Sequence, residues 1–503
     1  MPLFQLVTLL FATATLFYYA WYGLQVYRDI SRTEDYILIA RHLSGADYTQ
    51  TFVATSTSLA TALTFFFAFG SNYGFALIIS PIMFCLGVVL FRKITSIMDA
   101  DGFFDTGTTL HQYILSKYDN AFVKNIATIV SLLGYLGIFV IEMYVGVSIF
   151  TIFSPDPGWQ VFIAVILLLL IFIYVFLGGY PAVIKTDNLQ LKLIVSGLIL
   201  LLVTLIISVS SRGLWDEVAS TQYMNPLPTA LPWFFIVVMI VGNVPFQLLK
   251  MSNWHRAAAS GDVSTAKNAL TGGWKLTFLI WLGAIICGIL GGVIGKDTGI
   301  NGFDLIKAFH LLSHEIGTGT IWQLPVQYFV YPLLFCGSVA ALISTADSVF
   351  IPILATYIFD LRFQGKNVEK TEEISKKVLK STRKVVLLFM LLGVSIYILL
   401  TYVLKLQFID LLFIFFNQQL VLFPVVWIAL MNSKEKCSKF SVPAINSMII
   451  AGIATWGLAL YGGANQRNDL VMLSSAVGFI GSILVFYLTK PSAIFKLSVW
   501  RKF

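Results

Sequence analysis

Long apolar runs recur along the whole of this 503-residue chain, and they limit its fold more than any other feature. A helix needs roughly 20 predominantly apolar residues to cross the hydrocarbon core of a bilayer. The segments between the runs are too short to form a soluble domain. Thirteen runs of about that length can be placed, near residues 3–25, 49–70, 73–91, 122–152, 159–177, 182–208, 232–250, 268–294, 326–358, 385–404, 408–431, 442–462 and 469–489. The sequence therefore predicts an all-α membrane protein with about 13 transmembrane helices, forming one domain over residues 1–503.

The charge distribution predicts how the chain is oriented. Charged residues make up only 12% of the chain, against about 25% in soluble domains. The net charge is +8, and 28 of the 33 Lys and Arg residues fall on one side of the alternating loops. The other side keeps only Arg212, Lys296, Lys307, Lys405 and Arg467. Because basic residues gather in cytoplasmic loops, we expect a multi-pass protein of the plasma (inner) membrane. Its N-terminus would lie outside and its C-terminus in the cytoplasm, with no nucleic-acid partner.

The cysteines give no sign of a metal centre. Cys85, Cys287, Cys336 and Cys437 lack the spacing of a metal site or of a disulfide framework. The sequence also shows no phosphate-binding loop and no nucleophile–base pair. We therefore expect no enzyme activity and no cofactor.

A first polar site lies where one apolar run gives way to the next. Gly178-Gly179-Tyr180-Pro181 interrupts the two spans, and Asp187 follows about one turn into the second. A charged group inside a bilayer is costly and usually functional. The alternative is a capping or interfacial acid, which the positive end of the helix dipole would also favour.

A second polar site is a stripe of small and hydroxyl side chains within the span 326–358. Ala341, Ser344, Thr345 and Ser348 recur at i, i+3, i+4 and i+7, so they share one helical face, and Asp347 flanks them. Hard cations prefer several oxygen ligands, which this stripe can supply. The alternative is close packing with the hydroxyls bonded to the backbone. That alternative explains Ser and Thr better than it explains a buried Asp.

Two further spans carry signs of a cavity. Pro245 has no N–H, so together with Gly242 and Asn243 it predicts an interruption of the span 232–250. Transporters bind substrate where broken helices leave backbone groups free, although an ordinary proline kink remains the alternative. The span 49–70 is rich in Ser and Thr, so one of its faces is too polar for lipid and is expected to face a cavity.

The sequence does not assign a role to two further polar features. Glu142 is a lone carboxylate within the span 122–152, and it could face a polar path, pair with Lys275 or lie near the outer interface. Asn417 begins a polar Asn-Gln-Gln cluster within the span 408–431.

Taken together, these motifs resemble the sodium:solute symporter family. The resemblance is carried by Gly178-Gly179 through Asp187 to Gln190, by Ser344 to Ser348, by Trp254-His255-Arg256, and by Asp35-Tyr36-Ile37-Leu38 with Arg41. It covers nearly the whole chain in order and in loop length. It implies a five-plus-five inverted repeat over residues 49–431, with an extra N-terminal helix and loop over 1–48 and two extra C-terminal helices over 432–503.

The resemblance also implies binding sites for sodium. The family's sodium ligands correspond to the Ala341 carbonyl, the Ser344 and Thr345 hydroxyls, and carbonyls near Thr57 and Ala60 in the broken first core helix. A second cation site found in some members maps onto Asp187, Ser344, Asp347 and Ser348.

The resemblance implies substrate contacts as well, and here the sequence departs from one branch of the family. Asn243 matches a substrate-contacting Asn of the sugar-transporting branch, and Phe246 matches the aromatic gate beneath the substrate there. Thr61, Thr64 and Asn417 are further candidates for substrate contact. The span 73–91 carries apolar residues after Ser80-Pro81, where the sugar-transporting branch places an acid. An amino acid or carboxylate solute is therefore favoured over a sugar.

The function predicted from the sequence is sodium-coupled symport of a small organic solute by alternating access. Its partners would be the solute, sodium ions and the lipid bilayer. The competing interpretation is a transporter-like membrane sensor or receptor domain without net transport, since domains of this kind also occur fused to signalling kinases.

Overall fold

The computed structural model describes residues 2–27, 30, 33–226, 231–300, 302–314, 323–362, 372–400 and 408–490, and every regular element within them is helical. The longest helices are α1 (Leu3–Tyr27), α5 (Ile79–Ala100), α8 (Ala121–Ser148), α9 (Pro157–Arg212), α15 (Val263–Asp297), α18 (Tyr331–Ala355), α19 (Glu372–Ile398), α23 (Ser441–Ala464) and α24 (Asn468–Leu488). The expected all-α class is confirmed.

The predicted spans can be matched to these helices. In the described residues, ten helical stretches are long and apolar enough to cross a membrane, and one of them, Leu59–Ala100, covers two predicted spans. Two shorter apolar stretches, Gly158–Ile171 and Lys384–Ile398, account for two more spans. Each of the 13 predicted spans thus has a helical counterpart.

The joint between Gly178 and Pro181 is a kink within α9. Gly179 has φ 55° and ψ −146°, a conformation that is essentially restricted to glycine. A Cβ at Gly179 would lie 2.5 Å from the carbonyl oxygen of Tyr36. The kink redirects the chain while helical hydrogen bonding continues on both sides, so the two predicted spans form one interrupted helix of 56 residues.

Two spans are broken within the membrane. The first consists of α3 (Gly45–Ser56), a π-helical turn η2 (Leu59–Thr64) and α4 (Phe65–Tyr73). The second consists of α12 (Trp233–Asn243), α13 (Phe246–Leu249) and α14 (Met251–Ser260). The predicted interruption near Asn243–Pro245 is confirmed, and α18 stays helical through Ser348, as expected. In the five-plus-five repeat that the family resemblance implies, these broken spans would be the first members of the two units.

Short helices make the connections. They are α2 (Thr33–Leu38), α6 (Phe103–Thr106), α7 (Leu110–Tyr118), α10 (Trp215–Val218), α11 (Thr221–Met224), α16 (Leu305–His314), α17 (Gln323–Pro325), α20 (Phe408–Phe415), α21 (Phe423–Met431) and α22 (Lys434–Ser438). The 3₁₀ and π-helical turns are η1 (Ile39–Arg41), η3 (Gly74–Ile78), η4 (Ile149–Ile152), η6 (Val326–Val330), η7 (Thr356–Arg362) and η9 (Phe416–Leu422). Asp262, just before α15, accepts the N–H of Thr265 at 2.7 Å, and this backbone hydrogen bond lowers the pKa of Asp262.

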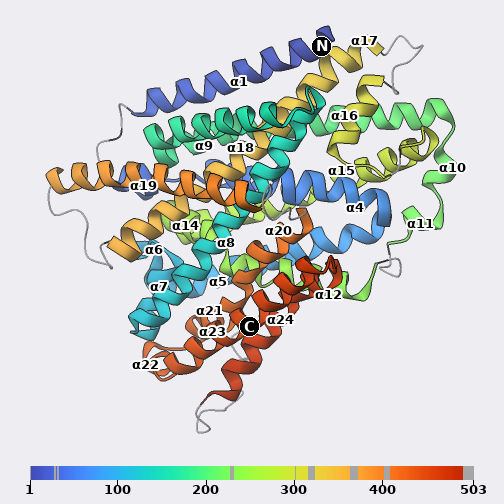
Figure 1. Cartoon of the computed structure of the whole chain (residues 1–503). Coiled ribbons are helices and arrows are strands. Elements are labelled where there is room, and N and C mark those ends of the chain that lie inside the picture. The colour runs from blue at the N-terminus through green and yellow to red at the C-terminus, as the bar shows by residue number, and fades with distance from the viewer. Residues whose placement is uncertain are drawn as a thin grey trace.

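The helices pack so that α18 lies inside the bundle and the chain's first and last spans lie at its edges (Figure 1). Helix α1 runs along α9 and α18 at one edge, and α23 pairs with α24 at the opposite edge. Large apolar side chains point outward from these edge helices, among them Phe17 at 70% exposed and Leu488 at 82%. By contrast, α18 is buried along its whole length. A helix that is apolar and buried all round needs partners on every side, which places its Ser, Thr and Asp residues in the interior.

Candidate functional site

The first broken span is interrupted at Thr57 and Ser58. Thr57 has φ −102° and ψ 56°, and Ser58 is extended at φ −62° and ψ 148°, so the helix stops and restarts there. Ser58 caps the second half, because its Oγ accepts the N–H of Thr61 at 2.8 Å. Glu142 of α8 completes this cap, since its carboxylate accepts the Ser58 hydroxyl and the N–H of Ala60, the latter at 3.4 Å.

The second broken span is interrupted twice. Val244 and Pro245 separate α12 from α13, and Lys250, with ψ 104°, separates α13 from α14. Asn243 holds the first interruption in place: its side-chain amide donates to the Met239 carbonyl at 2.7 Å and lies 3.4 Å from the Ser80 hydroxyl.

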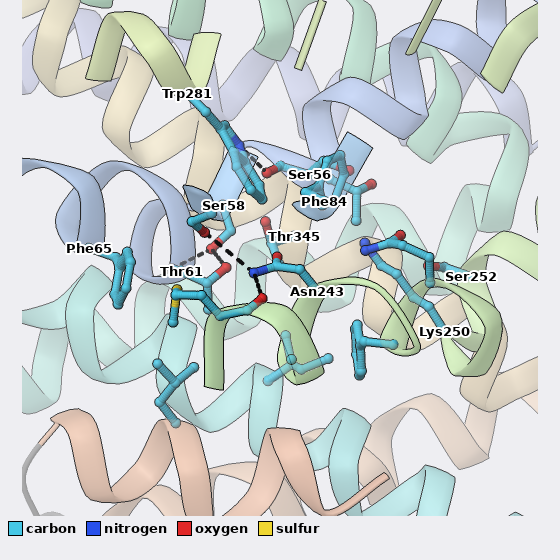
Figure 2. A pocket seen from close by; sticks show the side chains of 18 of the residues that line it. Ser56, Ser58, Thr61, Phe65, Phe84, Asn243, Lys250, Ser252, Trp281 and Thr345 are labelled. Atoms are coloured by element: carbon cyan, nitrogen blue, oxygen red, sulfur yellow. Dashed lines mark hydrogen bonds between the residues drawn. The ribbon is translucent and has the colours of Figure 1, made fainter. Parts of the chain in front are cut away.

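A cavity lies between the two broken spans. Its volume is about 120 Å³, whereas a single water occupies roughly 10–15 Å³ on the same scale. The cavity therefore has room for a small organic solute. Figure 2 shows Ser58 and Thr61 from the first broken span facing Asn243 from the second, with Trp281 of α15 and Thr345 of α18 completing the wall.

The residues predicted to contact substrate fall into three groups. Thr61, Asn243 and Phe246 line this cavity. Thr64 lies one turn beyond Thr61 but is not among the lining residues. Asn417 belongs to η9, and its side chain lies outside the part of the structure that is described.

The residues predicted to bind sodium come from elements that touch each other. Helix α18, which carries Ala341, Ser344 and Thr345, packs directly against α3 and η2 on either side of the break between Thr57 and Ala60. Thr345 lines the cavity and its hydroxyl donates to the Ala341 carbonyl at 3.1 Å. The Ser344 hydroxyl donates instead to Asp187 at 2.6 Å. The two hydroxyls are therefore held in place by partners within the bundle.

Two buried carboxylates face each other across α9 and α18. Asp187 of α9 accepts the Ser344 hydroxyl, and Asp347 of α18 accepts the Tyr174 hydroxyl. Both acids have no exposed surface. One oxygen of each, Asp187 Oδ2 and Asp347 Oδ1, accepts no hydrogen bond from the residues that the structure describes. Two negative charges in one low-dielectric site repel, and a proton, a bound cation or a nearby positive side chain can offset that repulsion.

A buried arginine joins this region from α14. Arg256 is 2% exposed and donates to the Thr51 carbonyl at 3.1 Å and to the Thr55 hydroxyl at 2.5 Å. The Thr55 hydroxyl lies 2.8 Å from that of Ser348, which lines the cavity. The guanidinium therefore reaches the hydroxyl network of α3 and α18 and supplies a positive charge that partly balances the two acids.

Three of these residues had no assigned role from the sequence. The sequence left three interpretations open for Glu142, and the structure places its carboxylate at the break in the first broken span. Lys275, the partner considered in one interpretation, is exposed and lies near the ring of Trp274 instead. Tyr174 sits in an apolar run without a polar neighbour in sequence. Arg256 entered only as part of the family's Trp-His-Arg motif, and its pairing with a hydroxyl-rich helix gave no sequence signal.

Comparisons with known proteins place this fold among transporters. Neither a protein-family model nor a curated relative matches the sequence. A solved sodium-coupled sialic acid symporter, in a substrate-bound outward-open state, matches with a TM-score of 0.74 and 17% identity over 96% of this chain and 97% of that one. MhsT, solved with L-phenylalanine, matches with a TM-score of 0.52 and 15% identity over 89% of this chain and 98% of that one. A manganese transporter from Eremococcus coleocola has the same TM-score and identity, over 89% of this chain and 95% of that one.

The shared feature of these structures is the fold. The chain has the helical architecture of secondary transporters built on inverted repeats, over nearly its full length. The first and the third of these proteins are transporters by their own descriptions, and none of the three is described as an enzyme. The apolar helices and this fold together define an integral, multi-pass membrane protein.

Proposed function

We propose that this chain is a sodium-coupled symporter of a small organic solute, working by alternating access, and a member of the sodium:solute symporter family. The observation that carries the proposal is the cavity between two broken helices, which Thr345 lines, while its neighbour Ser344 is bonded to Asp187. Broken helices at the start of two inverted repeats bind substrate and coupling ion in transporters. The similar sialic acid symporter is sodium-coupled by its own description, which supports the same coupling here.

The sodium site would be formed by the Ala341 carbonyl, the Ser344 and Thr345 hydroxyls, and the carbonyls of Thr57 and Ala60. Its ligands come from a broken span and from α18, which a moving bundle can bring together or separate. A sodium ion that bridges them stabilises one conformation and so raises the affinity for solute in that conformation. The coupling is reciprocal, because solute must then raise the affinity for sodium by the same factor.

The proposed solute is an amino acid or another carboxylate rather than a sugar. No Asp or Glu lines the cavity among the residues that the structure describes. Sugar hydroxyls would lack the acceptor that the sugar-transporting branch provides. The cavity wall is mainly apolar and aromatic, including Phe65, Phe84 and Trp281, which suits a solute with an apolar body and a polar head.

Uptake into proteoliposomes tests the proposal. Purified protein would be assayed with an inward sodium gradient against proline, phenylalanine, lactate, sialic acid and galactose, with potassium replacing sodium as the control. We expect at least one carboxylate to accumulate only with sodium. Specific binding of a solute without uptake under any ion gradient would favour the alternative of a membrane sensor domain.

A further inference from the structure

The start of α14 presents a lysine and a buried serine to the cavity. Lys250 is the only formally charged side chain among the described residues that line the cavity. Within the described part of the chain, its ammonium has no carboxylate at ion-pair distance. Ser252, also in the lining, is 3% exposed, and its hydroxyl has no hydrogen-bond partner among the residues that the structure describes. Figure 2 shows both residues at one end of the cavity wall.

The backbone around these side chains favours a negative charge. Lys250 precedes the first turn of α14, a helix of 10 residues whose N-terminal end carries a partial positive charge. The N–H of Ser252 is already bonded to the Tyr135 hydroxyl at 2.7 Å, which fixes the turn against α8. At the start of α14 the ammonium and the Ser252 hydroxyl are therefore the groups left to bind a ligand, and Arg256 adds a second positive charge on the same helix. Elsewhere in the wall, the Ser56 hydroxyl at the end of α3 also has no partner among the described residues, but no positive side chain lines the cavity beside it there.

The other half-helix at the cavity is arranged in the opposite way. At η2, the groups that could bind an anion are already used: the Ser58 hydroxyl and the Ala60 N–H both donate to Glu142. A carboxylate of the protein thus occupies the position that a substrate carboxylate takes at some broken helices. An anionic solute finds its unsatisfied donors at α14 and not at η2.

We propose that Lys250 and Ser252 form an anion site that binds the carboxylate of the transported solute. The inference rests on the proposed function and narrows its substrate class to small organic acids and zwitterions. The ammonium pairs with one carboxylate oxygen, and the Ser252 hydroxyl donates to an oxygen of the same group. Charge-assisted hydrogen bonds of this kind are stronger than neutral ones. The bound anion also balances a lysine charge that is otherwise uncompensated in a confined site.

Ligand binding to the purified full-length protein tests the site independently of transport. Thermal stabilisation at saturating sodium would be measured with proline, lactate and sialic acid, with the matched amides prolinamide and lactamide, and with galactose and choline. The best carboxylate would then be titrated against wild type, Lys250→Met, Lys250→Arg, Ser252→Ala and Lys275→Met. Lys275 is an exposed lysine on α15 and serves as the matched control.

The expected result is a loss that depends on the carboxylate. Lys250→Met should weaken binding of the carboxylate at least tenfold, and Lys250→Arg should weaken it less than Lys250→Met does. Ser252→Ala should weaken binding a few-fold, and Lys275→Met should leave it unchanged. Wild type should bind each amide more weakly than its acid, and Lys250→Met should remove that difference.

Three outcomes would overturn the site. The first is that both Lys250→Met and Ser252→Ala bind the carboxylate with unchanged affinity. The second is that amides or galactose bind wild type as tightly as the acids do, and the third is that no carboxylate stabilises the protein. If Lys250→Met does not fold, Lys250→Arg and Ser252→Ala test the site in its place. The site then predicts that both variants prefer the acid over its amide less strongly than wild type does, and an unchanged preference in both would overturn it. Binding that follows the expected pattern without sodium-driven uptake would contradict the proposed function and leave the anion site supported.

Discussion

Ser344 and Thr345 are proposed to bind sodium through their side-chain hydroxyls, and substitution by alanine removes each hydroxyl. Ser344→Ala and Thr345→Ala should each raise the sodium concentration for half-maximal uptake by roughly tenfold or more, since an interaction with a charged group contributes about 1.5–3 kcal/mol. The measurement is solute uptake as a function of sodium at fixed ionic strength. Ser338→Ala, on the same helix but bonded only to the Leu334 carbonyl, is the control. Normal sodium dependence in both variants would remove this pair from the site.

Asp187 and Asp347 test whether a second cation binds. Each leaves one carboxylate oxygen without a hydrogen bond among the described residues. If a cation binds them, Asp187→Asn and Asp347→Asn should each lower sodium affinity and reduce the Hill coefficient of sodium activation toward one. Tyr174→Phe, which removes the hydroxyl bonded to Asp347, should have a smaller effect.

The alternative for this pair is that hydrogen bonds and Arg256 satisfy the acids without an ion. Sodium activation that keeps its wild-type midpoint and slope in either Asn variant would show that this residue is not a ligand. The same outcome in both variants would leave a single sodium site.

At the scale of single elements, the kink in α9 depends on one glycine. Gly179→Ala should destabilise the protein by about 1–3 kcal/mol from backbone strain, with an added clash because the new Cβ lies 2.5 Å from the Tyr36 carbonyl. Gly457→Ala on α23, where a Cβ meets nothing within 4 Å, is the matched control. The measurement is the midpoint of thermal unfolding in detergent. Equal midpoints for the two variants would contradict the role given to Gly179.

Interruptions of helices could be predicted from the sequence because they have local causes. Pro245 with Gly242, and Gly178-Gly179 with Pro181, act through their own backbone, so their positions were placed correctly. The break at Thr57 has no proline or glycine, and it was placed only through the family resemblance.

Hydrogen-bond partners on different helices could not be predicted from the sequence. Ser58 meets Glu142, 84 residues away, and periodicity identifies a helical face but not the helix opposite it.

At the scale of the whole molecule, the order of spans and the division of charge predict the fold and the orientation. The fold is confirmed, whereas the orientation and the boundaries of the core at 49–431 stay predictions. Cysteines would be introduced at Ser211, in the last turn of α9, and at Ser438, in α22, which are both exposed positions. In intact cells a membrane-impermeant maleimide should label Ser211→Cys, and it should label Ser438→Cys only after permeabilisation. The reverse pattern would show that the N-terminus is cytoplasmic.

Coupling is the central claim, and it is argued at the scale of the whole molecule because the proposed sodium and solute sites share α18 and the first broken span. Simultaneous fluxes of radioactive sodium and of the best solute into proteoliposomes measure it most directly, at zero membrane potential. The account predicts that solute stimulates sodium entry, that sodium stimulates solute entry, and that Ser344→Ala with Thr345→Ala weakens both together. Solute entry that continues at the same rate without sodium, or sodium entry that solute does not change, would contradict sodium-coupled symport.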